Sequence, residues 1–270
     1  MTPFLRTGFA FLTALALLAA CASAPVPPVA DVAPKGSLRV AVGVGAAASA
    51  FWTTRDASGK LRGVTVELGK AAAEQLGIPL QIVEYQNSGE ITAAAAKGDW
   101  DISFMPGDPE REKFIDPGPA FVVYESGYLV RPGSTIRNAA EVDRAGTRVG
   151  AVEGTSTSRT VAKALKQATL TLYPKPETAM QLLAEGKLDA IAAGRDGLLE
   201  FSQRTPGTRL LDDVIQSTGV IVVVPKDRPA TRAWAAQFLE KAKQDGTVRR
   251  ALDSAGFTTA QVAPPSTPRP

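Results

Sequence analysis

TRVGAVEGTSTSRTVAKALK, residues 147–166, reads as a β-strand that passes directly into an α-helix. Residues 147–152 are mainly apolar, and the helix expected over 155–166 follows a glycine and begins with hydroxyl side chains, which suit a helix N-terminus. A strand that feeds a helix is the repeating unit of a parallel sheet with helices on both faces. This stretch therefore predicts an α/β fold.

The same alternation of strands and helices continues on both sides of this stretch. The expected strands cover 37–42, 80–85, 100–105, 170–173, 188–193 and 220–224, and the other expected helices cover 63–77, 91–97, 177–184, 230–243 and 247–255. Residues 220–224 are all Val or Ile, which predicts a buried parallel strand. The length allows one large domain or two lobes of ordinary size.

The composition excludes several classes of function. Thirty Lys and Arg face 27 Asp and Glu, giving a net charge of +3, and no basic stripe with interleaved aromatics occurs, so we expect no nucleic-acid partner. Histidine is absent and there is a single cysteine. Without the commonest metal ligand and general base, we expect no metal, no other cofactor and no catalytic residue.

The N-terminus is typical of an export signal. One basic residue, Arg6, precedes a mainly apolar run over 9–18. The following Leu18-Ala19-Ala20-Cys21 resembles the bacterial lipobox, in which the signal is removed before a cysteine that then carries lipid. Ordinary cleavage after Ala20 or Ala24, with Cys21 incidental, is the alternative. We favour a lipoprotein signal peptide over 1–20 and a lipid on Cys21.

Two further terminal segments are proline-rich and aperiodic. Residues 21–35 are predicted to be a Pro/Ala-rich tether, and residues 259–270 a disordered tail.

Several phrases along the chain resemble, in order, those of the amino-acid-binding (family 3) periplasmic solute-binding proteins of ABC importers. No single phrase is specific, but six in the family's order span about 36–257. They are Gly59-Lys60-Leu61-Arg62-Gly63 with Val64 to Leu68, Gly98-Asp99-Trp100-Asp101, Pro109 to Asp116 around Arg111, Gly150 to Ser156, Gly186-Lys187-Leu188-Asp189-Ala190 and Asp245-Gly246-Thr247.

The resemblance implies a type II periplasmic-binding-protein fold. Each lobe would be a mainly parallel sheet flanked by helices, with residues 36–124 and 218–258 in lobe 1 and 125–217 in lobe 2. Two crossing strands, at 121–130 and 217–224, would join the lobes.

The implied function is capture of a small carboxylate-bearing solute, an amino acid or related organic acid, by hinge closure. The protein would be a monomer in the periplasm, tied to a bacterial membrane through Cys21, and would deliver its solute to an ABC transporter permease.

Arg111 is the first candidate ligand-binding residue. The family's arginine at this place grips the ligand carboxylate, and a guanidinium suits a planar anion. The alternative is a surface arginine paired with Asp108 or Glu110.

Thr155 and Ser156 are the second candidates, because free N–H groups at a helix start attract anions. Simple capping of the helix by either hydroxyl is the alternative, and both can hold at once.

The aromatic side of the expected cleft departs from the family. Its stacking aromatic falls here at Ser49, with Phe51 and Trp52 following. Trp52 reads more readily as core, and Phe51 is the better candidate for a cleft wall.

The polar side departs as well. The position of the family's ammonium-binding aspartate falls at Gly194. Asp196 could bind an ammonium in its place only if the turn that follows the strand were shifted. Pro106, next to Met105 at the cleft, replaces the usual Ser or Thr. A buried ammonium without a carboxylate is costly, so we expect discrimination against ordinary α-amino acids, or an amino acid held through Asp196.

Two other functions stay open. Some relatives of this fold dehydrate cyclic acids such as prephenate or arogenate, and Glu153 is the one acid that could serve here; its alternative is a solvated side chain at a strand end. The other possibility is a ligand sensor that has lost transport.

Overall fold

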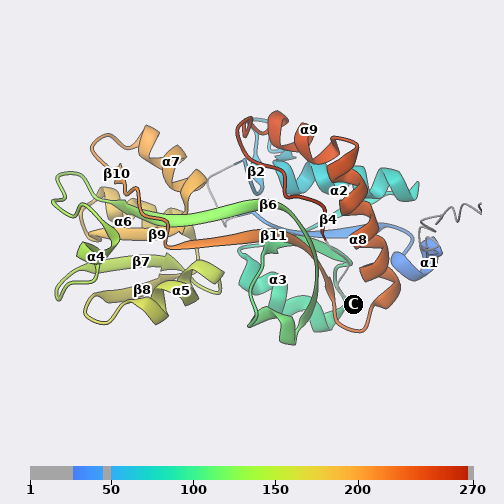
Figure 1. Ribbon diagram of the computed structural model, residues 1–270, viewed down its shortest axis with the longest axis horizontal. Coiled ribbons are helices and arrows are strands. Elements are labelled where there is room, and N and C mark those ends of the chain that lie inside the picture. The colour runs from blue at the N-terminus through green and yellow to red at the C-terminus, as the bar shows by residue number, and fades with distance from the viewer. Residues whose placement is uncertain (1–26, 45–49, 267–270) are drawn as a thin grey trace, which may run out of the picture.

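The computed structural model describes residues 27–44 and 50–266, which form two lobes that share one mixed sheet (Figure 1). In this part of the chain the sheet has nine strands in the order β4-β1-β5-β11-β6-β9-β7-β8, with β10 beside β6. The strands are β1 (Leu38–Gly43), β4 (Leu80–Tyr85), β5 (Ile102–Pro106), β6 (Ile115–Val130), β7 (Arg148–Val152), β8 (Thr169–Tyr173), β9 (Ala190–Gly194), β10 (Arg209–Leu210) and β11 (Gln216–Pro225). A small separate hairpin joins β2 (Thr54–Arg55) to β3 (Leu61–Arg62).

Helices cover both faces of the sheet in each lobe. They are α1 (Val29–Val32), α2 (Val64–Leu76), α3 (Ser88–Ala94), α4 (Ala139–Val142), α5 (Ser156–Ala164), α6 (Pro176–Ala184), α7 (Arg195–Arg204), α8 (Pro229–Gln244) and α9 (Thr247–Ser254), with 3₁₀ turns at Ala95–Lys97 and Arg111–Lys113. Lobe 1 packs α2, α8 and α9 on one face and α3 on the other; lobe 2 packs α4 and α5 opposite α6 and α7. The predicted α/β class and two-lobed type II architecture are confirmed.

Strands β6 and β11 cross between the lobes. β6 pairs with β11 from Ile115 to Ser126, and its last five residues, Ser126–Val130, pair with β9 in lobe 2. Register shifts in β11 beside Ile221 bend the β6–β11 ladder. The exact lobe boundaries at 124/125 and 217/218 stay a proposal.

The prediction of a parallel strand at 220–224 is wrong. β11 runs antiparallel to both β5 and β6. Its apolar run reflects burial on both faces of the sheet, and such burial does not depend on the direction of the neighbouring strands.

Matching aspartates tie each lobe together at the start of a strand. Asp101, just before β5, accepts hydrogen bonds from the Arg39 backbone N (2.9 Å), Nε (3.1 Å) and Nη2 (2.7 Å). Asp189, just before β9, receives the same three bonds from Arg148 at 3.0, 2.9 and 3.0 Å. Arg39 and Arg148 lie on β1 and β7, so each Gly-x-x-Asp phrase fixes one strand against its neighbour.

Both predicted terminal segments are shorter than expected. Residues 29–32, assigned to the tether, form α1, whose buried Val32 packs in the lobe 1 core and accepts a hydrogen bond from Thr231. In the tail, Val262 bridges to Val122 and Ala263 is buried, so the predicted disorder is wrong at these residues. Apolar Val and Ala within a proline-rich sequence explain both differences.

Cys21 and the predicted signal lie outside the described residues, as does Ser49. No helix in the described part of the chain is long and apolar enough to cross a membrane.

Candidate ligand-binding cleft

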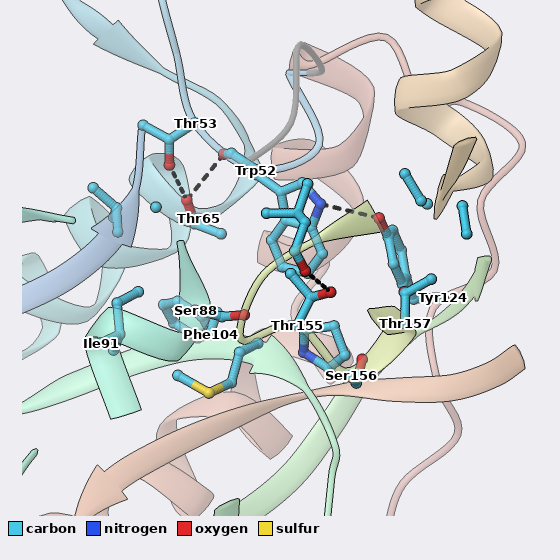
Figure 2. A pocket seen from close by; sticks show the side chains of 18 residues that line it. Trp52, Thr53, Thr65, Ser88, Ile91, Phe104, Tyr124, Thr155, Ser156 and Thr157 are labelled. Atoms are coloured by element: carbon cyan, nitrogen blue, oxygen red, sulfur yellow. Dashed lines mark hydrogen bonds between the residues drawn. The ribbon is translucent and has the colours of Figure 1, made fainter. Parts of the chain in front are cut away.

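A cavity of about 60 Å³ lies where the two lobes meet (Figure 2). Lobe 1, β6 and lobe 2 all contribute to its wall, as expected of a small-molecule site between domains. The wall is made of Val42, Gly43, Trp52, Thr53, Thr65, Ser88, Ile91, Phe104, Met105, Pro106, Tyr124, Val152, Thr155, Ser156, Thr157, Ala192, Ala193 and Gly194. None of these residues has an ionisable acidic or basic side chain apart from the phenol of Tyr124.

Helix α5 presents its N-terminus to the cavity from lobe 2. Thr155 is the N-cap: its Oγ1 accepts from the Ser158 N–H at 3.1 Å and donates to the Val152 carbonyl at 2.8 Å. The N–H groups of Ser156 and Thr157 have no acceptor within the helix, because the first turn lacks preceding carbonyls. This end of α5 therefore offers neutral donors and the positive end of a helix dipole.

Ser88 lies opposite, at the start of α3 in lobe 1. Asn87 caps this helix by accepting from Gly89 N (2.8 Å) and Glu90 N (3.0 Å). The cap fixes the first residue of the helix, Ser88, at the cavity wall.

Arg111 lies behind Ser88, outside the cavity wall. Its Nη2 donates to Ser88 Oγ at 2.6 Å and, across the cleft, to the Gly154 carbonyl at 3.0 Å. The residue is only 3% exposed, and its Nε has no hydrogen-bond partner among the described residues. Burial lowers the pKa of the guanidinium to about 10, and nearby Arg159 lowers the pKa further while Asp108 opposes the shift. Arg111 is thus a buried cation at neutral pH.

The surface alternative for Arg111 is wrong. Asp108 pairs with Arg159, whose Nε lies 2.8 Å from Oδ2, and Glu110 pairs with Lys113 at 2.7 Å. Each carboxylate thus has its own cationic partner, and neither forms a hydrogen bond or an ion pair with Arg111.

Tyr124 connects the aromatic wall with lobe 2. Its hydroxyl accepts from the Trp52 indole N–H at 3.2 Å, and the Asp196 carboxylate lies near the same hydroxyl. Burial, and next the charge of Asp196, raise the pKa of Tyr124 well above its usual value, so the phenol stays neutral.

Gly194 faces the same hydroxyl. A Cβ built on residue 194 would lie 1.5 Å from the Tyr124 hydroxyl oxygen and 2.8 Å from Asp196 Oδ1. A side chain at 194 and the present position of Tyr124 therefore exclude each other.

Further contacts hold the lobes together across the cleft. Besides the Arg111–Gly154 and Asp108–Arg159 pairs, Asn87 Nδ2 lies 3.5 Å from the Pro174 carbonyl. A Cβ added to Gly89 would lie 2.8 Å from the Gly154 Cα. These contacts describe a closed cleft.

The candidate residues from the sequence divide into two groups. Trp52, Met105, Pro106, Thr155, Ser156 and Gly194 line the cavity, whereas Arg111, Phe51 and Asp196 do not. The expectation for the two aromatics is reversed. Phe51 is buried against Tyr124 and Phe257, and Trp52 forms the wall. Asp196 lies in the first turn of α7, a helix that the sequence analysis missed.

Sequence reasoning missed Ser88 and Tyr124. The signal for Ser88 was present, because Asn87 followed by Glu90 is a capping pattern that starts α3 three residues earlier than predicted. Tyr124 carries no local signal; its role comes from the crossing of β6 between the lobes.

Among the described residues, no group of three or more His, Cys, Asp or Glu side chains could hold a metal ion. Glu153, the candidate catalytic acid, is exposed and absent from the cavity wall.

Bacterial extracellular solute-binding proteins, family 3, match residues 40–255. The chain belongs to this family. An L-arginine-binding protein of Pseudomonas aeruginosa is 27% identical over 168 residues, which cover 60% of this chain and 64% of that relative, so the match spans less than two-thirds of its length.

Two solved structures show the same fold. One, the ancestral amino-acid-binding protein AncCDT-1, described as a precursor of cyclohexadienyl dehydratase, superposes with a TM-score of 0.75 at 21% identity over 84% of this chain and 98% of that one. The other, a solute receptor for L-cysteine of Neisseria gonorrhoeae, gives 0.77 at 19% identity over 86% and 94%.

Proposed function

We propose that the protein is the solute-capturing component of an ABC importer and binds a small carboxylate-bearing molecule between its lobes. Membership of the solute-binding family and a cavity built from both lobes support capture by hinge closure. The ligand would stabilise the closed form, which a membrane permease would recognise.

The observation that carries this proposal is the buried charge of Arg111. Its guanidinium is protonated at neutral pH, and no carboxylate of the described residues pairs with it. A buried cation without a counter-charge is unfavourable, and an anionic ligand would supply that charge.

The carboxylate would lie between Ser88 and the N-terminus of α5. Because Arg111 donates to Ser88 Oγ, the Ser88 hydroxyl proton stays available for a ligand oxygen. The N–H groups of Ser156 and Thr157 would receive the ligand from the other lobe. A carboxylate could also replace the Gly154 carbonyl on Arg111, which would give a direct charge-assisted bond.

The location belongs to the same proposal. A lipid on Cys21 would hold a monomer at the periplasmic face of a bacterial membrane, near its permease. Cys21→Ser should release the protein from the membrane fraction, and mass spectrometry of the mature N-terminus would distinguish a lipidated Cys21 from ordinary cleavage.

A dehydratase of the same fold is less well supported. The resemblance to AncCDT-1 is at the level of fold. Glu153, the candidate catalytic acid, is exposed and does not line the cavity, so in this closed form it is not placed to transfer a proton to a bound ligand. A function as a sensor without transport would leave the cleft unchanged, so only a test with the permease separates it.

Calorimetric titration of small carboxylates against Arg111→Met tests the proposal. Methionine keeps much of the buried volume and removes the charge, so binding should weaken by about 100-fold or more. Arg204→Met, on an exposed part of α7, is the matched control and should bind normally. If native protein binds no carboxylate, or Arg111→Met binds as tightly, the proposal is wrong.

A further inference from the structure

We propose that Tyr124 determines specificity: its neutral hydroxyl makes the cleft select small monocarboxylates that lack an ammonium group. This inference deepens the proposed function and rests on it.

The cavity wall offers a cation no counter-charge. Its described residues contribute hydroxyls, backbone groups, apolar side chains and the sulfur of Met105, but no carboxylate. A ligand ammonium enclosed there would lose its water and gain only neutral acceptors. Burying a charge in this way is strongly unfavourable.

Tyr124 reaches the cavity wall, and the neighbouring carboxylate of Asp196 does not. A Cβ built on Gly194 would lie 1.5 Å from the Tyr124 hydroxyl oxygen and 2.8 Å from Asp196 Oδ1, so the phenol and the carboxylate are neighbours. The Tyr124 hydroxyl oxygen accepts from the Trp52 indole at 3.2 Å. One lone pair remains for a ligand, and a neutral oxygen cannot balance an ammonium.

Residue 194 cannot supply the missing acid while Tyr124 keeps this place. Its Cβ would fall 1.5 Å from the hydroxyl oxygen and 2.2 Å from the ring carbon that carries it. Glycine at 194 and tyrosine at 124 therefore form one arrangement, in which the phenol fills the space that a side chain from β9 would take.

The remaining wall limits the body of the ligand. The volume of about 60 Å³ corresponds to roughly four to six water-sized positions in the closed form. Ile91, Phe104 and Met105 present apolar surface, so the part of the ligand beyond its carboxylate should be short and uncharged.

The experiment compares ligands that share a carbon skeleton. Propanoate, lactate and pyruvate are titrated against alanine, using native protein, Tyr124→Phe and Arg111→Met. Tyr128→Phe is the matched control, because Tyr128 is a buried tyrosine of the same strand that does not line the cavity. Thermal unfolding of each variant monitors folding.

Native protein should bind at least one of the three acids about tenfold or more tightly than alanine. In Tyr124→Phe the hydroxyl next to Asp196 is gone, which leaves room for a ligand ammonium to approach that carboxylate, so alanine should gain relative to the acids by about tenfold. Tyr128→Phe should keep the native ratio.

Two results would overturn the inference and leave the proposed function standing. One is Arg111-dependent binding of alanine that equals or exceeds that of the acids in native protein. The other is an unchanged ratio in Tyr124→Phe. Absence of all binding, or binding that ignores Arg111→Met, would instead overturn the proposed function.

Discussion

Arg111 of lobe 1 and Gly154 of lobe 2 meet across the cleft, with Nη2 of the guanidinium 3.0 Å from the glycine carbonyl oxygen. Gly154 has a φ of +70°, which a residue with a side chain rarely adopts, and this conformation turns the chain from β7 into the N-cap of α5. The Gly154 carbonyl in this turn thus accepts the hydrogen bond that joins the two lobes at the buried Arg111 guanidinium. Closure and charge are coupled at one contact.

Gly89→Ala should weaken ligand binding by hindering closure. The new Cβ would lie 2.8 Å from the Gly154 Cα, and an overpacked contact typically costs about 1–3 kcal/mol, or roughly 5- to 150-fold in affinity. The same Cβ would also lie 2.9 Å from Asn87 Oδ1, the oxygen that caps α3, so the cap has to shift as well. Titration calorimetry would measure the affinity, small-angle scattering with ligand the degree of closure, and denaturant unfolding of the ligand-free protein the effect on stability.

Gly69→Ala is the control for that substitution. Gly69 lies in α2, and its Cβ would meet only Val40 of the same lobe, at 3.3 Å. Its affinity should be native. Equal affinities of native protein and Gly89→Ala would show that the lobes lie farther apart around a bound ligand than in this closed structure.

The affinity for a carboxylate should fall as the pH rises above about 10. The pKa of Arg111 is lowered to about 10 by burial, and a bound anion raises it again. Binding is therefore independent of Arg111 titration at lower pH, and above pH 10 the free protein loses the proton that the complex retains. The loss approaches tenfold per pH unit.

The same pKa has the opposite effect on ligand-free stability. An unfolded arginine keeps its proton to higher pH than the buried Arg111 does. The free energy of unfolding of the ligand-free protein should therefore increase as the pH rises above about 10, because the folded state no longer buries a charge at Arg111. Arg111→Met lacks both effects, and subtracting its pH profile isolates them. Parallel profiles of the two proteins would contradict the prediction.

Gly194→Ala should destabilise the native protein and do so much less in a Tyr124→Ala background. Its Cβ overlaps the Tyr124 hydroxyl, and only a smaller residue at 124 leaves room for it. The two changes should deviate from additivity by about 1–3 kcal/mol in denaturant unfolding. Additive free energies would mean that Tyr124 moves away without cost.

Most of the fold follows from local sequence patterns, because each strand–helix unit carries its own signals. Helix α2 ends at Gly77, which adopts a φ of +66° as a C-cap, and this end was predictable from the residue alone. The direction of β11 was not predictable, since residues 220–224 would be equally apolar in either direction. Helix α7 was missed because its polar sequence has few apolar positions.

The site was predicted less completely, because its geometry depends on how two lobes meet. Thr155 and Ser156 could be placed from the helix cap. Phe51 and Trp52 were assigned the wrong way round, since the choice depends on Tyr124, which contacts both. Arg111 was found through the resemblance, but its position behind Ser88 depends on where α3 begins.

The last prediction concerns the paired aspartates that fix each lobe. Asp101→Asn should lower the free energy of unfolding by about 3–5 kcal/mol, because Arg39 would be left buried without its counter-charge.

Asp189→Asn should lower the free energy of unfolding by less, since its partners Arg131 and Arg148 are 39% and 46% exposed and water can replace the carboxylate. Hydrogen bonds from Arg148 hold the pKa of Asp189 well below its usual range, so its contribution is present at neutral pH and is lost as the pH falls through the lowered pKa. The difference between native protein and Asp189→Asn in urea unfolding should therefore be largest near neutral pH and shrink below about pH 4. Glu200→Gln, which removes an exposed i,i+4 partner of Arg204, is the control and should change stability by less than about 0.5 kcal/mol. A difference for Asp189→Asn that grows as the pH falls would mean that the carboxylate is destabilising where it lies.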